Sequence, residues 1–266
     1  MESRREDEGP LLTFGGHLEV LRGMLFRMVL VVTVLAVVIF MFKEQTFRML
    51  LAPGKWDFVT YRHMEACVRA LGFDFEFEHY QVNLISTELA SQFMVHLSSS
   101  FYLALLGASP YLLYEVFRFV SPALYVSEKR HALLLVVSMY VLFACGVLLS
   151  YYLVFPISFR FLGTYQVDTS VVNTITLVSY ISAFTTLTFM LGLLFQLPVI
   201  AFGLAKLGLL SAAFLKCYRR HAFIVILTVA AIITPSVDMF TLALVTLPVY
   251  GLYELCIVVI RRVERS

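Results

Sequence analysis

Residues 132 to 155 read ALLLVVSMYVLFACGVLLSYYLVF, a run of 24 residues without one charged side chain. A helix of that length rises about 36 Å, because each residue adds about 1.5 Å. The hydrocarbon core of a bilayer is about 30 Å thick, so an uncharged run of about 18 residues or more is a candidate membrane-spanning helix. This stretch alone predicts that the chain crosses a membrane.

Five further apolar runs extend this prediction to the whole chain. The 266 residues are 60% hydrophobic and 14% charged, with a mean hydropathy of +0.86, and a water-soluble domain could not bury so much apolar surface. The runs lack the alternation of a membrane β-barrel, and otherwise only helices satisfy their backbone in lipid. We predict an all-α polytopic membrane protein with one membrane domain over residues 1–266 and six spans, at about 24–42, 93–114, 132–155, 175–204, 222–233 and 239–260.

Two segments fit this scheme less simply. The fifth run, 222–233, would rise only about 18 Å, so it is either a buried or re-entrant helix or a span. It could span if the bilayer thins or if residues upstream of His221 join the helix. The loop 43–92 is the only large segment expected outside the membrane, and its stretch FDFEFEHY (73–80) suggests that it is partly ordered.

The distribution of basic residues predicts the orientation. Six spans place both termini and two loops on one side, and that side carries fourteen of the twenty Lys and Arg residues. The remaining six are diluted by acidic residues such as Glu44, Glu65 and Glu88. Because cytoplasmic loops carry the excess of Lys and Arg, both termini are expected in the cytoplasm.

Several function classes find no support in the sequence. The net charge of +2 gives no reason to expect a nucleic-acid partner. No HExxH, GxSxG, Walker or GxGxxG motif occurs. The four cysteines lie far apart, without the spacing of a metal site. We therefore expect neither an enzyme nor a bound metal or cofactor.

Polar residues inside the runs are candidates for function. Gln196 lies mid-run, two residues before Pro198, and Glu254 lies in the last turns of the sixth run. A charge deep in lipid costs about 2.5–3.5 kcal/mol on insertion scales, so it should meet a partner, a cavity or the interface. Gln196 is equally consistent with an interhelical hydrogen bond, and Glu254 with a pair to a basic residue.

Two stretches on the predicted cytoplasmic side place a carboxylate among arginines and apolar residues. They are HLEVLRGML (17–25) and FRFVSPALYVSEKR (117–130). The simplest interpretation is ordinary charge pairing at helix ends, for example between Glu128 and Lys129. Recognition of a cationic ligand is the alternative.

The order of several motifs is more specific. HLEVLR (17–22), LLAP (50–53), FVSPALYVSEKR (119–130), FQLPV (195–199), ITPSVD (233–238) and LPVYGLYE (247–254) follow one another along the chain. This series resembles the TatC family, the multispanning receptor component of the twin-arginine protein translocase. The resemblance covers the chain from His17 to Glu254.

The resemblance implies a concave bundle of six spans with short fifth and sixth spans and cytoplasmic termini, in the cytoplasmic (inner) membrane of a prokaryote. It implies binding of the twin-arginine signal peptides of folded cargo proteins. It also implies small single-span partners of the TatA and TatB type, a possible homo-oligomer, and transport driven by the proton-motive force without a nucleotide.

By the motifs, Glu128 and the aromatic Phe119 ahead of the proline in PALY are expected to bind the signal peptide. Two guanidiniums suit carboxylates, because each is a planar fork that donates two parallel hydrogen bonds. The remaining residues that match family motifs are Pro53, Pro122, Pro198, Pro235, Asp238 and Glu254.

The sequence departs from the family at three places. The embedded glutamate of the fourth span is Gln196 here, although the family pattern implies that a glutamate would be tolerated there. A family glutamine is replaced by Leu242, which leaves Thr241 as the nearby polar residue. The glutamate of the first motif falls at Val20, so Glu19 is a candidate that must approach from a face rotated by about 100°.

A proton-coupled transporter of small molecules is the rival function. Such proteins are built from repeated halves with paired broken helices at mid-membrane. Prolines interrupt the runs at Pro198 and Pro248, but the two halves of the sequence show no repeat.

Overall fold

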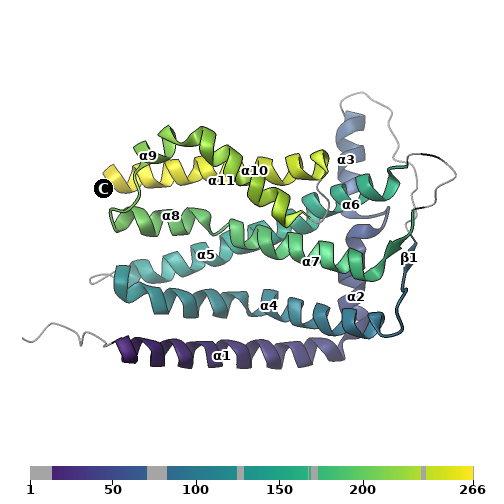
Figure 1. The fold of residues 1–266 in the computed structure, drawn as a ribbon, viewed down its shortest axis with the longest axis horizontal. Coiled ribbons are helices and arrows are strands. Elements are labelled where there is room, and N and C mark those ends of the chain that lie inside the picture. Colours follow the sequence, from purple (N-terminus) through teal and green to yellow (C-terminus); the bar gives the residue numbers. More distant parts are fainter. Residues whose placement is uncertain are drawn as a thin grey trace, which may run out of the picture.

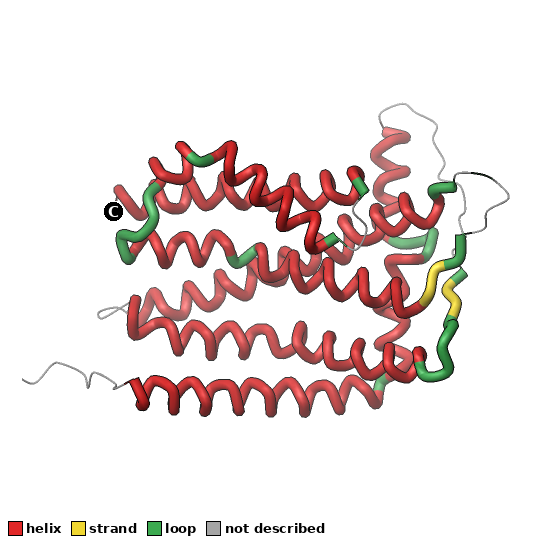
Figure 2. Tube along the Cα trace, viewed as in Figure 1, coloured by secondary structure: helices red, strands yellow, loops and turns green. Residues whose placement is uncertain are grey.

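The computed structural model describes residues 14–70, 83–124, 129–166, 168, 173–234 and 238–265. Long helices lie side by side and cross the molecule in one direction (Figures 1 and 2). They are α1 (Phe14–Met41), α4 (Ser91–Leu124), α5 (Lys129–Leu149), α6 (Phe155–Thr164), α7 (Leu177–Leu194), α8 (Leu197–Lys206), α10 (Arg219–Ile233) and α11 (Met239–Arg265), with a short α9 (Ala212–Cys217) before α10. We call the end of the bundle where α1 begins and α11 ends the terminal end (Figure 1).

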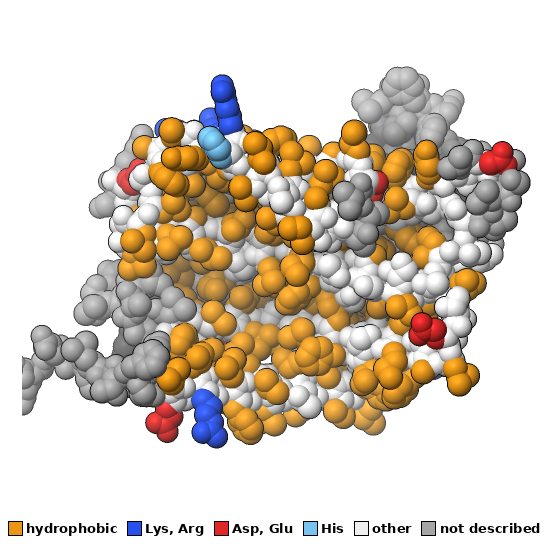
Figure 3. All heavy atoms as spheres, in the orientation of Figure 1, with side chains coloured by type: hydrophobic (Ala, Val, Ile, Leu, Met, Phe, Trp, Pro, Cys, Tyr) orange, Lys and Arg blue, Asp and Glu red, His pale blue; other side chains and the backbone are white. Residues whose placement is uncertain are grey.

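The helices confirm a membrane protein. Among the described residues, four helical stretches are long and apolar enough to cross a membrane: Leu18–Met41, Leu133–Thr164, Leu177–Lys206 and Met239–Glu264. The predicted second run lies within the 34-residue α4. The fifth lies within the 15-residue α10, which begins at Arg219, so residues upstream of His221 do join it. Figure 3 shows apolar side chains spread over the visible face, with charged side chains near its two ends.

Two predicted runs are not single α-helices. Residues 132–155 continue to Thr164, but a π-helical turn, η2 (Ser150–Val154), separates α5 from α6. Pro156 lies in the first turn of α6 and donates no backbone hydrogen bond, so a local adjustment of the helix there is expected. The run 175–204 divides into α7 and α8, and Pro198 lies in the first turn of α8, where its missing N–H loses no hydrogen bond.

Within the predicted loop 43–92, the described residues 43–70 and 83–90 form a cap at the end of the bundle opposite the termini (Figure 1). It contains α2 (Lys43–Leu51), the 3-10 turn η1 (Ala52–Gly54), α3 (Val59–Ala70) and β1 (Leu84–Ile85). β1 pairs in parallel with β2 (Ile175–Thr176). The prediction of an all-α chain was wrong at this small sheet, which is too short to leave an alternating pattern in the sequence.

Tyrosines attach the cap to the bundle. The Tyr180 hydroxyl donates to the Leu50 carbonyl at 3.0 Å, and the Tyr61 hydroxyl donates to the Pro156 carbonyl at 2.6 Å. Pro53 is buried, and a Cβ added at Gly54 would come within 2.9 Å of the Tyr180 ring. The cap therefore packs closely on the helices beneath it.

The main core lies beside this cap. Phe155, Phe159, Tyr180 and Phe184 form edge-to-face and stacked pairs with ring centroids 4.8–5.8 Å apart. Such geometries stabilise aromatic pairs beyond the area that they bury. These aromatic pairs thus join α6 to α7 beneath the cap.

The packing of α1 is different, because it contacts the rest of the bundle mainly through α4. Val32 is buried against Ala104 and Ala108, and Leu35 lies 3.1 Å from a Cβ built at Gly107. Small residues let two helices approach closely, which is how helices associate in lipid. A second such seam joins α5 to α7, where a Cβ at Gly146 would lie 2.7 Å from the Leu191 carbonyl oxygen.

The seam between α5 and α7 predicts a stability difference between two Gly→Ala substitutions. Gly146→Ala should lower the melting temperature of the purified protein in detergent, because forced repacking costs about 1–3 kcal/mol. Gly251→Ala is the matched control: it also lies within a helix, but an added Cβ there meets nothing within 4 Å. The control should melt at the same temperature or higher, since alanine favours helices by about 1 kcal/mol. Equal melting of the two variants would contradict this seam.

Candidate functional site

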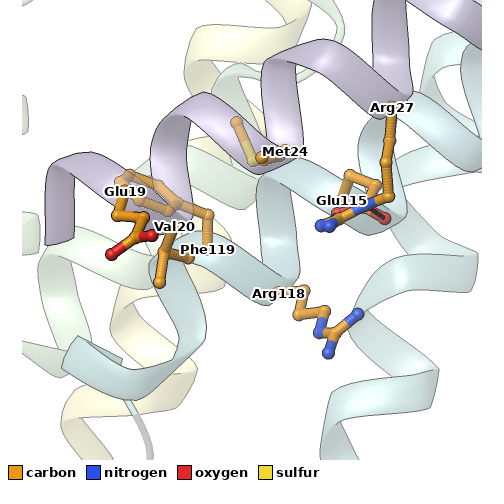
Figure 4. Close-up of a pocket in the computed structure, with 8 residues that line it drawn as sticks. Glu19, Val20, Met24, Arg27, Glu115, Arg118 and Phe119 are labelled. Atoms are coloured by element: carbon orange, nitrogen blue, oxygen red, sulfur yellow. Dashed lines mark hydrogen bonds and ion pairs between the residues drawn. The ribbon is translucent and has the colours of Figure 1, made fainter. Parts of the chain in front are cut away.

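A cavity of about 500 Å³ opens between α1 and α4 near the terminal end of the bundle. Its volume falls within the range of small-ligand sites. Figure 4 shows the side chains that converge on it from the two helices. The lining residues are Glu19, Val20, Gly23, Met24, Arg27, Glu115, Arg118 and Phe119.

Helical periodicity explains why these residues share the cavity. On α1, Val20, Gly23 and Arg27 are spaced by three and four residues, so they form one face. On α4, Glu115 and Phe119 are four residues apart and likewise face together. The cavity is therefore lined by one stripe from each helix.

A partly buried ion pair joins the two walls of the cavity. Arg27 Nε donates to Glu115 Oε1 at 3.2 Å, and Arg27 Nη2 donates to Glu115 Oε2 at 3.0 Å. The Tyr111 hydroxyl donates to the same Oε1 at 2.9 Å. The Glu115 side chain is 5% exposed and the Arg27 side chain is 48% exposed. A buried carboxylate thus receives the two-pronged guanidinium contact that stabilises it best.

Two predicted binding residues lie in this cavity. Glu19 and Phe119 both line it, as does Val20 at the position of the family glutamate (Figure 4). Glu19 is exposed to solvent. The third predicted binding residue, Glu128, lies outside the described residues.

Sequence reasoning missed the pair of Arg27 and Glu115. A signal was present, because Arg27 lies inside the first predicted run and Glu115 follows directly after the second, which was ended at Tyr114. A guanidinium and a carboxylate within neighbouring apolar helices each require a partner. On that ground the pairing of Arg27 with Glu115 could have been predicted from the sequence.

Gln196 makes the interhelical hydrogen bond that was one interpretation of its sequence position. Its Nε2 donates to the Met139 carbonyl of α5 at 2.9 Å, and the side chain is buried. Its Oε1 has no hydrogen-bond partner among the described residues. Gln196 also precedes α8, whose first turn contains Pro198. The side chain therefore ties the break between α7 and α8 to α5.

Glu254 pairs with a basic residue, as its simpler interpretation expected. Its Oε2 lies 2.6 Å from Arg219 Nη2, and both side chains are partly exposed. The contact joins the start of α10 to α11. This pair is distant in sequence from the residues of the cavity.

The remaining motif residues have structural positions. Asp238 Oδ1 accepts a hydrogen bond from the Thr241 backbone N–H at 2.7 Å, which is the contact of a helix N-cap at α11. The Thr241 side chain is buried, and its hydroxyl has no partner among the described residues. Pro122 lies in the last turn of α4, and Pro235 lies outside the described residues.

In the described part of the chain, no group of three His, Cys, Asp or Glu side chains could hold a metal ion.

Known proteins resemble this chain over most of its length. A family model described as Sec-independent protein translocase protein (TatC) matches residues 16–248. A Sec-independent protein translocase protein TatC from Helicobacter pylori is 38% identical over 192 residues, which cover 72% of this chain and 76% of that protein. One from Deinococcus radiodurans is 32% identical over 245 residues, 92% of this chain and 84% of that protein. A crystal structure of a twin-arginine translocase receptor, TatC, matches with a TM-score of 0.72 and 26% identity, covering 92% of this chain and 98% of that chain.

The contacts of Gln196 favour an amide over the carboxylate that the family pattern tolerates. The neighbouring group is the Met139 carbonyl, which accepts but cannot donate. Gln196→Glu should lower the melting temperature in detergent at neutral pH, because a buried charge without a partner costs about 3 kcal/mol or more. Gln196→Met, which keeps the volume, should cost about 1 kcal/mol or less. A glutamate variant as stable as the methionine variant would show that another group compensates the charge.

Proposed function

The chain belongs to the TatC family of Sec-independent protein translocase proteins, and from this premise we propose that it is the membrane receptor for twin-arginine signal peptides. It is a component of a protein translocase and a transport protein of a prokaryotic membrane. In this role it receives folded cargo proteins and helps to move them across the cytoplasmic (inner) membrane, driven by the proton-motive force. The alternative of a small-molecule transporter predicted paired broken helices, whereas the described helices break before Pro198 but α11 continues through Pro248.

The observation that carries this proposal is the cavity between α1 and α4. It gathers Glu19 and Phe119 at the terminal end of the bundle, and α4 ends four residues before Glu128 in the sequence. Carboxylates beside a membrane bind guanidinium more strongly than they would in bulk water, because the effective dielectric constant is lower. Phe119 offers an apolar contact for the hydrophobic part of a signal peptide. The site thus matches a peptide that joins two arginines to an apolar run.

The same proposal includes the topology. All six apolar runs span the membrane as one concave domain over residues 1–266, with both termini cytoplasmic and the cap outside. The excess of Lys and Arg at the terminal end supports this orientation. The 15-residue α10 would rise about 22 Å, so it requires local thinning of the bilayer.

The proposed partners are small single-span proteins of the TatA and TatB type and other copies of this chain. We place the contact with the single helix of such a partner at the short α10 and the adjoining α11, where the bilayer would be thinned. The exposed apolar side chains of Phe223, Ile224 and Val225 on α10 support this placement.

Discrimination between arginine and lysine tests the receptor function. The protein in lipid nanodiscs should bind a synthetic peptide with RRxFLK before an apolar run about tenfold more tightly than its twin-lysine counterpart, a difference of about 1.4 kcal/mol. Fork geometry is the reason, since the two peptides carry equal charge. Fluorescence anisotropy of labelled peptides measures both affinities.

Three variants refine this measurement. Glu128→Gln should abolish binding, and Glu19→Ala should weaken it partly. Glu44→Gln, a matched loss of one acidic charge in the cap, should have no effect. Equal affinity of the two peptides for the unaltered protein would refute the receptor function.

Cysteine labelling tests the topology. Cys217 is exposed in α9 near the terminal end, and Glu44 is exposed in α2 of the cap. In a background without other cysteines, a membrane-impermeant maleimide added to intact spheroplasts should label Glu44→Cys and leave Cys217 unmodified. Disrupting the membrane should make Cys217 reactive. Labelling of Cys217 in intact spheroplasts would contradict the proposed cytoplasmic location of α9.

A further inference from the structure

We propose that Glu115 is the second guanidinium-binding carboxylate of this site, and that Arg27 occupies it until an arginine of the ligand takes its place. The inference rests on the proposed function, because it names the group that receives one arginine of a twin-arginine peptide. In this proposal Arg27 is an internal competitor that occupies the binding position of the ligand arginine.

The first argument comes from the face that α1 presents to the cavity. Val20 and Arg27 are seven residues apart, so they lie within about 20° around the helix, whereas Glu19 lies about 80° from Arg27. The face that continues from Val20 therefore carries no acid. The buried carboxylate that this face does meet comes from α4 and is Glu115. In this chain the acid that a ligand arginine needs is supplied from the opposite wall.

The second argument is the geometry of the existing pair. Arg27 uses Nε and Nη2 on the two oxygens of Glu115, at 3.2 and 3.0 Å, which is the fork contact that an arginine ligand would make. The third donor, Tyr111, lies on α4 and would stay in place during an exchange. Lysine has no fork, so it could not reproduce both contacts. The site is already shaped for guanidinium.

The third argument is that Arg27 can leave while Glu115 cannot. The Arg27 side chain is 48% exposed and borders the open cavity, whereas Glu115 is 5% exposed. A Cβ at Gly23 would lie 3.7 Å from Arg27 Nη1, so the side chain runs back along α1 toward the terminal end. A buried carboxylate without its partner is strongly unfavourable. Release of Arg27 is therefore expected only when another cation replaces it.

A purely structural role is the competing explanation, in which the pair only fastens α1 to α4. The apolar seam of Val32, Ala104 and Ala108 already joins these helices. The two explanations differ in what happens when Arg27 is removed. If the pair is only structural, the contact between α1 and α4 is lost. If Glu115 is a binding residue, its carboxylate becomes free to bind another guanidinium.

Chemical rescue distinguishes the two without any peptide. Arg27→Ala should lower the melting temperature of the protein in detergent, and methylguanidinium should restore it more than methylammonium does. The unaltered protein and Arg22→Ala, which removes an exposed arginine of α1 that does not line the cavity, should show no such selective effect. Absence of selective rescue would overturn the proposal and favour a purely structural role of the pair.

Peptide binding supplies the second readout. In nanodiscs, Arg27→Ala should bind the twin-arginine peptide about fivefold or more tightly than the unaltered protein, because the internal competitor is gone. The double variant Arg27→Met with Glu115→Met removes both charges and so avoids an unpaired carboxylate. It should remain folded but lose most of the preference for arginine over lysine. Unchanged affinity in the first variant, or retained preference in the second, would overturn the proposal.

These results separate the inference from the function on which it rests. If the unaltered protein does not distinguish the two peptides, the receptor function fails, whatever the rescue shows. If it distinguishes them and Glu128→Gln abolishes binding while both Arg27 tests are negative, only the role of Glu115 fails.

Discussion

A polar group that this chain carries into its apolar helices is costly unless it has a partner inside the protein, because the lipid core offers none. This constraint explains the contacts that link the helices. The carboxylate of Glu115 meets Arg27, the amide of Gln196 meets the Met139 carbonyl, and the Ser150 hydroxyl donates to Thr188 at 3.1 Å. Each contact joins helices that are distant in sequence, so the few polar residues also define which helices are neighbours.

The two ends of the bundle are held together by different contacts, and the cavity lies at the end where α1 packs mainly on α4. Aromatic rings and the cap hold α2, η1, α6 and α7 together at one end. At the other end α1 packs mainly on α4, and only 11% of its most apolar stretch is buried within the protein. The cavity lies along this junction, between the facing stripes of α1 and α4.

The sequence predicted the class of fold well, because long runs without charge have only one stable form in lipid. It placed the helix ends poorly and missed the π-turn at 150–154, the break before Pro198 and the pairing of β1 with β2. These features depend on local backbone geometry and on contacts between distant segments. Motifs predicted Glu19 and Phe119 as binding residues, and both line the cavity, but the pairing of Arg27 with Glu115 depends on which faces of two helices meet. That information is absent from a pattern of apolar runs.

The replacement of a family glutamate by Val20 has a physical consequence when it is considered with Arg27. An acid at position 20 would lie on the same face of α1 as Arg27, two turns away, and would compete with Glu115 for its guanidinium. With valine there, Arg27 meets the buried carboxylate of Glu115 on the opposite wall of the cavity, and the pair is complete within the protein. Exchange of Arg27 for a ligand arginine leaves the net charge of the buried site unchanged, so it avoids the cost of exposing a lone charge to a low dielectric. Selection then depends on the geometry of the fork, which is the property that separates arginine from lysine.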